Sequence, residues 1–373
     1  MTTIGAPVLS PRALGRALLE RQLLLRRATL PALDAVEHLV GLQAQSPLDP
    51  YYALAARLDG FRPEDLARLL ASREAVRIAV MRSTIHLVSA RDCRTLRPLL
   101  QPVQDRGFRS NHGKRLGEVD LDRLAARARE LVAVRPYTFH ELGRELAGEW
   151  PGAVPQDLAM AARTLLPLVQ VTPRALWGHS GPAAHTTVET WLGGGLDPAP
   201  DLGDMVLRYL AAFGPASVKD LQTWCGLTRL REVVDRLRPG LRTFRDAGGA
   251  ELFDVPDGPL PDKDTPAPVR FLPEFDNLLL SHADRSRIID PAHLRRLWRT
   301  NRAYRSFLLD GTVGGLWRLD RERAGGEERA TVVVEPFGRI PEAGRAAVED
   351  EAAGVLAMAA PDARHEVRYG EVA

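Results

Sequence analysis

The chain has 373 residues, of which 45% are apolar and 26% charged, so it can bury the cores of two or three compact domains and is not a disordered polypeptide. No run of about 18 uncharged apolar residues occurs, which argues against a membrane-spanning helix, and the N-terminal segment lacks the pattern of a secretory signal. Two cysteines, Cys93 and Cys225, are too few for a disulfide framework or a cysteine-based zinc site. We therefore expect a cytoplasmic protein.

The net charge of +2, from 50 basic and 48 acidic residues, does not by itself indicate a nucleic-acid binder. Only Lys114, Lys219 and Lys263 are lysines, and the other 47 basic residues are arginines. A GC-rich coding sequence accounts for this bias, although guanidinium groups also suit phosphate and guanine contacts. Composition alone therefore leaves the function open.

The first 133 residues predict helices followed by a β-hairpin. Apolar positions at helical spacing predict helices over 10–23, 31–42 and 63–70, the first with Ser10 as N-cap and Pro11 at its first position. The β-branched stretch 75–90 contains neither Gly nor Pro and predicts two short strands. This order of elements is typical of a winged helix–turn–helix.

Two later segments repeat one capped pattern. Residues 136–142 and 215–221 both read Pro, any, Ser/Thr, apolar, any, acid, Leu, and each has the spacing of a capping box. Each predicts two helices, at 141–147 and 156–166 and at 219–224 and 230–238. Two strands then close each unit, at 169–177 with 185–190 and at 241–245 with 251–255, the last two joined by a turn at Gly248-Gly249. Any capped helix pair would match so short a pattern, but three such units favour a repeat.

The C-terminal part departs from this repeat. A linker rich in Pro and Asp at 256–268 precedes a buried strand and an acidic, irregular segment, and a helix is predicted at 292–298. The remainder predicts a small antiparallel sheet, a final helix over 342–359 and a loop at 323–329. The predicted units are 1–133, 134–198, 199–258 and 259–373.

Common catalytic motifs are missing from the sequence. The nine histidines are scattered without metal-ligand spacing, and there is no GxSxG, P-loop or dinucleotide fingerprint. His179 and His185, which flank a Gly-Pro turn, are expected at the surface. We expect neither a metal nor another cofactor.

Four segments together carry a family resemblance. They are LQAQSP at 42–47, MRSTIHLVSARD at 81–92, FGPASVKDLQTWCGL at 213–227 and FLPEFDNLLLSHADRSRII at 271–289. In this order they resemble the winged-helix DNA-binding superfamily that contains the DNA glycosylases AlkZ and AlkX, over nearly the whole chain. The pair Gln43 and Gln45, separated by an apolar residue, resembles the AlkZ-like branch, whereas the AlkX-like branch has Asp in the last place.

The resemblance implies an α+β fold of three tandem winged helix–turn–helix units in a C-shape around a DNA-sized channel, with a small C-terminal antiparallel sheet plus helix. It implies a monofunctional DNA glycosylase that hydrolyses the N-glycosidic bond of N7-alkylated purines and unhooks interstrand crosslinks. The partner would be double-stranded DNA with such lesions, bound by a monomer. The biological role would be self-resistance to a DNA-alkylating natural product such as azinomycin B.

Chemistry indicates how Gln43 and Gln45 could be catalytic. A glutamine amide is neither an acid nor a base near pH 7. A guanine alkylated at N7 is already cationic, however, so it leaves as a neutral base without being protonated. The enzyme then needs to place a water molecule and direct carbonyl dipoles at the positive charge that develops on the sugar. Pro47 favours a non-helical backbone at the pair, so that the helix before it would end near 43–45.

Candidate DNA contacts follow from charge. The stretch 104–115, read as a loop, offers Arg106, Arg109, Lys114 and Arg115 to phosphates, although a solvated loop between units would look the same. Arg82 and His86 share one face of the predicted hairpin strand, with the channel or the wing surface as its environment. Asp276 and Asp284 are more simply explained as partners of nearby arginines such as Arg285 and Arg287. Trp224, Trp298 and Trp317 are expected in the core.

Two alternatives remain open at this stage. A non-catalytic winged-helix transcriptional regulator would bind specific sequences and require neither glutamine. A glycosylase whose natural lesion is a monoadduct, with crosslink unhooking incidental, would have the same sequence features.

Overall fold

A six-stranded sheet with the order β2-β4-β3-β6-β7-β5 lies at the centre of the computed structural model, which describes residues 6–299, 302–324 and 326–371. Its strands are Leu42–Gln43 (β2), Ala75–Ala79 (β3), Ile85–Ser89 (β4), Tyr137–Thr138 (β5), Leu168–Gln170 (β6) and Ala184–Thr187 (β7). All neighbours are antiparallel. Both predicted strand pairs form, but β6 ends at Gln170, shorter than expected, and the pairing of β3 with β6 joins the two hairpins into one sheet.

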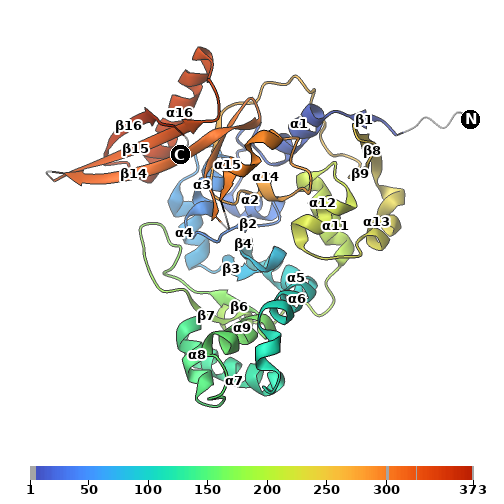
Figure 1. Ribbon diagram of the computed structural model, residues 1–373, viewed down its shortest axis with the longest axis vertical. Helices are drawn as coiled ribbons and strands as arrows, with labels where there is room; N and C mark the ends of the chain where they lie inside the picture. Colours follow the sequence, from blue (N-terminus) through green and yellow to red (C-terminus); the bar gives the residue numbers. More distant parts are fainter. Residues whose placement is uncertain (1–5, 300–301, 325, 372–373) are drawn as a thin grey trace, which may run out of the picture.

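Four helices come from the N-terminal part of the chain (Figure 1). They are α1 (Pro11–Arg21), α2 (Ala32–His38), α3 (Asp49–Ala55) and α4 (Pro63–Ala71). Ser10 caps α1 by accepting a hydrogen bond from the Ala13 N–H at 3.2 Å, as predicted. Helix α2 is shorter than predicted: Val40 and Gly41 have φ of 54° and 89°, which stops the helix, and the chain continues as β2.

Residues 90–134 are helical almost throughout. The elements are α5 (Ala90–Leu99), α6 (Gln101–Asn111), η2 (Gly113–Leu116) and α7 (Leu121–Val134). The prediction of a loop over 104–115 was therefore wrong. Val103, Gln104 and Phe108 follow helical spacing and are buried, so α6 has an inner face that a search for charged residues overlooks.

A helical lobe projects at one end of the molecule and contains α7, α8 (Phe139–Ala147) and α9 (Pro155–Leu165), with α10 (Val188–Leu192) following β7 (Figure 1). The predicted capping box forms, because Thr138 Oγ1 accepts from the Glu141 N–H at 3.2 Å and Glu141 Oε2 accepts from the Thr138 N–H at 2.8 Å. Leu124, Leu142 and Leu158 bring the three helices together in one core.

A third group of elements repeats the order of helices and hairpin. It contains α11 (Leu202–Phe213), α12 (Val218–Cys225), α13 (Arg231–Leu237), η3 (Arg238–Gly240), β8 (Arg242–Asp246) and β9 (Glu251–Asp254). Ser217 and Asp220 form the second predicted capping box, and Gly249 has φ of 84° in the predicted turn. The N-terminal strand β1 (Val8–Leu9) pairs with β8 in parallel, so the start of the chain packs against this group (Figure 1).

The C-terminal part forms a five-stranded sheet with the order β10-β13-β14-β15-β16. Its elements and those between them are β10 (Arg270–Leu272), α14 (Asn277–Leu280), η4 (Pro291–His293), α15 (Leu294–Leu297), β11 (Trp298–Arg299), β12 (Arg302–Ala303), β13 (Ser306–Leu309), β14 (Thr312–Ala324), β15 (Glu327–Pro336), α16 (Glu342–Ala359) and β16 (Arg364–Tyr369). Helix α16 has the bounds predicted for it.

The expectation of an antiparallel C-terminal sheet was wrong in one respect. Strand β16 was not predicted, and it pairs with β15 in parallel because α16 carries the chain back across the sheet as a crossover. The predicted loop at 323–329 is instead the end of a long hairpin, in which β14 runs to Ala324 and β15 starts at Glu327; residue 325 lies outside the described residues. Within the described part of the chain, no helix is long and apolar enough to cross a membrane.

Candidate active site

Gln43 and Gln45 lie at the edge of the central sheet, where β2 pairs only with β4. Gln43 lies opposite His86, and the pairing continues beyond β2 because the Ala44 N–H donates to the Ile85 carbonyl at 2.8 Å. Gln45 follows β2 in a bend, and its amide oxygen reaches the backbone N–H of Ile85 on β4. The non-helical backbone expected from Pro47 is confirmed for Gln43, which lies in a strand.

The amide of Gln43 is fixed by Arg82. Gln43 is 8% exposed, and its Oε1 accepts a hydrogen bond from Arg82 Nη2 at 2.6 Å. A guanidinium can only donate, so the Gln43 atom that faces it must be oxygen, and the orientation of the amide follows from chemistry. In the described part of the chain, Gln43 Nε2 has no protein acceptor and is left for a ligand or water.

Gln45 is exposed and more weakly attached. Its Oε1 accepts from the backbone N–H of Ile85 at 3.4 Å, a long hydrogen bond that leaves the second lone pair of this oxygen unused. The backbone N–H can only donate, so the carbonyl end of this amide is also identified. Gln43 is therefore buried and held by a short hydrogen bond, whereas Gln45 is accessible.

Arg82 lies in the strained turn η1 (Met81–Ser83) between β3 and β4, not on a strand as the sequence predicted. Arg82 and Ser83 have φ of 53° and 58°, a conformation that side chains other than glycine seldom adopt. Arg82 Nη1 donates to the carbonyl of Trp224 at the end of α12, so one guanidinium joins the turn, Gln43 and the third group of elements. Burial lowers the pKa of Arg82 to about 10, so it stays charged at neutral pH.

His86 lies beside this contact and is neutral. It is 1% exposed, and its pKa is lowered to about 3 by burial first and by the charge of Arg82 second. Its Nδ1 lies 3.0 Å from the Thr84 carbonyl, which can only accept, so Nδ1 carries the proton and Nε2 faces Arg82 at 3.5 Å. His86 can therefore supply no proton at pH 7.

Helix α14 supports β2 from behind. Asn277 Nδ2 donates to the Gly41 carbonyl at 2.6 Å, and Asn277 Oδ1 accepts from the Gln43 N–H at 3.4 Å. Asp276 forms a double hydrogen-bonded ion pair with Arg57, with both side chains fully buried. The prediction that Asp276 pairs with Arg285 or Arg287 was therefore wrong. Asp284 instead accepts from the N–H and hydroxyl of Ser286.

Comparison with known families and solved structures identifies the family of this chain. The model of the family described as "DNA glycosylase AlkZ-like" matches residues 36–358, which include both glutamines. The chain belongs to the AlkZ-like DNA glycosylase family. The solved structure of the Streptomyces sahachiroi DNA glycosylase AlkZ shares its fold, with a TM-score of 0.76 and 22% identity over 97% of this chain and 100% of that chain. Comparison with curated proteins gave no significant match.

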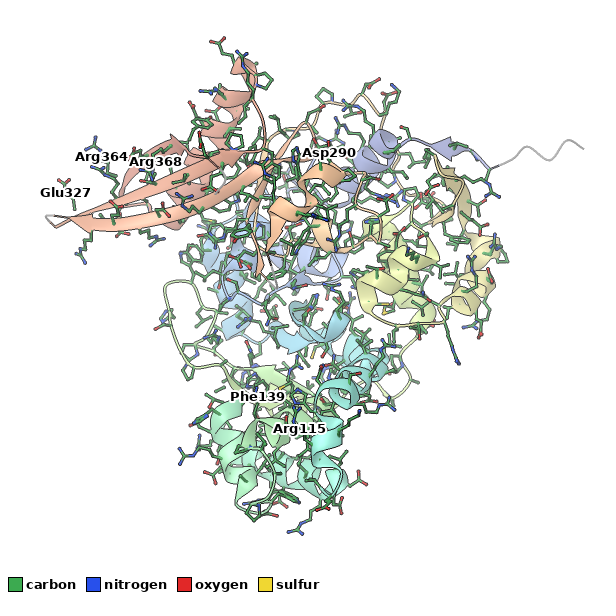
Figure 2. The ribbon with its side chains drawn as sticks, viewed as in Figure 1. Arg115, Phe139, Asp290, Glu327, Arg364 and Arg368 are labelled. Atoms are coloured by element: carbon green, nitrogen blue, oxygen red, sulfur yellow. The ribbon has the colours of Figure 1, made fainter. Side chains whose placement is uncertain are left out.

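The other predicted DNA contacts of this AlkZ-like chain are spread along α6 and η2. All four side chains are exposed: Arg106, Arg109, Lys114 and Arg115. Arg106 donates to the carbonyl of Gly226, which adjoins α12 and lies against the backbone of Arg82, so this arginine is near the glutamine pair. Arg115 lies in the helical lobe with Phe139 and makes two hydrogen bonds to Asp157 (Figure 2). DNA contact by these residues, by Arg82 and by His86 stays a prediction.

Sequence reasoning overlooked the polar groups behind the glutamines. Arg77 is 3% exposed and donates from Nη2 to the carbonyl of Ala44, between the two glutamines, at 2.6 Å. The sequence feature that could have identified Arg77 is its charge inside an otherwise apolar strand.

His185 was expected at the surface, but it is 1% exposed. Its ring stacks on Phe139 with ring centroids 4.0 Å apart, and burial lowers the pKa of His185 to about 4.

The predicted core tryptophans are mostly confirmed. Trp224 and Trp317 are each 3% exposed, and Trp298 is partly buried under the guanidinium of Arg285. In the described part of the chain, no cluster of three His, Cys, Asp or Glu side chains could hold a metal ion.

Asp49 is a buried carboxyl without a hydrogen-bond partner among the described residues. Burial raises its pKa to about 7; Arg305, 3.8 Å away, lowers the pKa, and Glu274 raises it. The unfolded carboxyl titrates near 3.8, so between about pH 4 and 7 the native state holds one more proton than the unfolded state. The free energy of unfolding contributed by Asp49 therefore falls as pH rises through this window and is constant above it.

We expect Asp49→Asn to remove this pH dependence. Thermal unfolding of the variant and the wild type at pH 5 and pH 8 should show the variant gaining stability relative to the wild type at the higher pH. The size follows from about 1.4 kcal/mol for each pKa unit, so a few kcal/mol is the upper bound. Unfolding temperatures of the two proteins that run parallel between pH 5 and pH 8 would contradict this role of Asp49.

Proposed function

We propose that this protein is a monofunctional DNA glycosylase that hydrolyses the N-glycosidic bond of N7-alkylated purines, including those in interstrand crosslinks, with Gln43 and Gln45 as its catalytic residues. Membership of the AlkZ-like family over 36–358 carries this proposal. The two side chains next to Gln43 agree with it, because His86 is neutral and Arg82 is a cation that only donates hydrogen bonds. A cationic leaving base does not need to be protonated, so two amides suffice where an ordinary purine would require an acid.

The orientation of the amides favours a division of roles. Gln43 turns its carbonyl to Arg82, so its Nε2 is the group available to donate to the water or to the lesion. Gln45 keeps an exposed carbonyl oxygen with an unused lone pair, which suits it to accept from the attacking water and to stabilise positive charge on the sugar. We infer that Gln45 holds the water and that Gln43 fixes its direction.

The proposed DNA-binding architecture is three winged helix–turn–helix units at 1–133, 134–198 and 199–258, arranged as a C, with 259–373 as an additional segment. The helix-and-hairpin order of the first three groups supports this arrangement. An open channel suits a crosslink, whose far end is tethered to the other strand and cannot enter a deep pocket. A monomer would be sufficient, and protection against a DNA-alkylating natural product such as azinomycin B would be the biological role.

The test is base release from a duplex that carries a single N7-methylguanine, followed by alkaline cleavage of the resulting abasic site. The expected result is an alkali-labile break at the lesion with wild-type protein. A crosslinked duplex in a parallel assay tests unhooking, which would appear as separation of the strands under denaturing conditions. Tight binding to both substrates with no release from either would contradict the proposal.

A further inference from the structure

A pocket of about 410 Å³ lies between the start of α3, the loop after β6 and the C-terminal sheet. Leu48 immediately precedes α3, Tyr52 lies in α3, and Trp177 lies in the loop. Leu319 and Arg321 lie on β14, and Arg305 precedes β13. The volume is in the range that binds small organic groups. Nothing in the proposed glycosylase chemistry uses this pocket.

The charge of the lining distinguishes the pocket beside Trp177 from an acidic pocket beside α2 and α4. The lining residues include two arginines and no carboxylate, and the carboxylates nearest to these arginines, Asp49 and Glu328, lie outside the lining at 3.8 and 3.6 Å. By contrast, the pocket beside α2 and α4 contains four carboxylates, Asp34, Asp59, Asp65 and Glu74, against Arg68 alone. A DNA strand carries one negative charge for each nucleotide, so it is attracted to the first pocket and repelled by the second.

The aromatic wall suits a flat ring. Trp177 is partly buried and packs on the buried rings of Tyr51 and Tyr52, at centroid distances of 4.9 and 6.2 Å. Stacking on such a ring stabilises an unpaired base whatever its identity, because every base has a π-face. The guanidinium of Arg305 lies 4.5 Å from the ring of Tyr52 and 3.8 Å from Asp49, so its position is fixed in advance.

Arg321 completes the pocket from the opposite side. It alternates with Leu319 and Trp317 on one face of β14, and its Nη2 donates to the Ala359 carbonyl at the end of α16. Its Nη1 lies 3.6 Å from Glu328, an exposed pair in which the Arg321 side chain is 47% exposed, so a phosphate would compete with this carboxylate for the guanidinium. The pocket thus presents an aromatic surface flanked by two guanidinium groups.

The pocket is close to the glutamine pair. Leu48, at its rim, follows Gln45 by three residues, which span at most about 11 Å of extended chain. That length corresponds to about three nucleotide steps of a DNA strand. A strand whose lesion lies at Gln45 would therefore bring a neighbouring nucleotide to the pocket.

We propose that this pocket binds one unpaired nucleotide of the DNA strand near the lesion, with its base stacked on Trp177 and its phosphate between Arg305 and Arg321. The proposal deepens the proposed function and rests on it for the position of the lesion. It adds a subsite that selects locally unpaired DNA before any bond is broken.

The test uses unmodified DNA, so that it does not depend on base release. One duplex carries a single unpaired 2-aminopurine, and its control carries the same base fully paired. We expect the full-length protein to bind the first duplex about tenfold more tightly, because an unpaired base can stack on the aromatic ring, and to quench the fluorescence of that base. Trp177→Ala and Arg321→Ala should each remove most of this preference.

Arg329→Ala is a matched control. Arg329 is 51% exposed with one carboxylate at 3.8 Å, whereas Arg321 is 47% exposed with one at 3.6 Å, and both lie on the β14–β15 hairpin. Equal binding of the two duplexes by the wild type, or a preference that survives in both pocket variants, would overturn the proposal. Arg321→Ala keeps the test valid if Trp177→Ala does not fold. A preference for unpaired DNA without base release would refute the glycosylase activity and support the nucleotide-binding pocket. Base release without the preference would support the glycosylase activity and refute the pocket.

Discussion

Gln45→Ala is expected to lower single-turnover base release from an N7-methylguanine duplex by about 100-fold or more, because removal of one preorganised polar group from a transition-state site commonly costs a factor of this size. Gln43→Ala should cause a loss of similar order. Affinity for the duplex should stay within about twofold, since neither amide carries a charge that attracts phosphates. Enzyme-excess base release and fluorescence anisotropy measure the two quantities. Gln156→Ala, an exposed glutamine on α9, is the matched control.

Arg82 gives a second test of the same arrangement. Because it orients Gln43 through the 2.6 Å hydrogen bond, Arg82→Ala should slow base release by about tenfold in the wild type and have little further effect in Gln43→Ala. Arg82→Lys can restore the charge but not both hydrogen bonds, to Gln43 and to the Trp224 carbonyl, so it should rescue only in part. Losses that add in the double variant would mean that Arg82 acts on DNA directly.

Sequence reasoning succeeded where structure is determined by neighbouring residues. Three helices begin at predicted caps whose contacts span three residues: α1 at Ser10, α8 at Thr138 with Glu141, and α12 at Ser217 with Asp220. The hairpin turn at Gly249 and the bounds of α16 are local in the same sense. The end of α2 also had a local signal, because Gly41 adopts the positive φ that terminates many helices. The prediction relied on Pro47 instead and so placed the helix end too late.

The failures concern contacts between distant residues. No local pattern predicts that β3 pairs with β6, or that β16 returns beside β15. The sequence identified Gln43 and Arg82 as functional candidates, but not that one orients the other, because the strained backbone of η1 decides where Arg82 points. The same holds for Asp276, whose partner is 219 residues away. The mixed α+β class was therefore predictable and the supporting contacts were not, while the catalytic role of Gln43 and Gln45 stays a prediction.

Asp276→Ala is expected to destabilise the protein by about 3–5 kcal/mol, because it leaves the guanidinium of Arg57 charged in the interior. Arg57 Nη2 and Nη1 donate to Asp276 Oδ1 and Oδ2 at 2.7 and 2.9 Å, and neither side chain is exposed. Among the described residues, the Ala53 carbonyl is then the one acceptor that Arg57 keeps. Urea unfolding should show the loss as a lower midpoint, and Glu366→Ala, which breaks an exposed pair with Arg329, should cost less than about 1 kcal/mol.

Replacing both members of the buried pair separates charge from packing. Arg57→Met with Asp276→Leu leaves no unpaired charge, so the double variant should be more stable than Asp276→Ala, and the difference reports the cost of the isolated guanidinium. Asp276 also caps α14 by accepting from the Leu278 N–H at 2.9 Å, and α14 positions Asn277 against Gly41 and Gln43. The double variant should therefore regain stability but still release base more slowly than the wild type. Full recovery of both properties would show that the ion pair does nothing for the glutamine site.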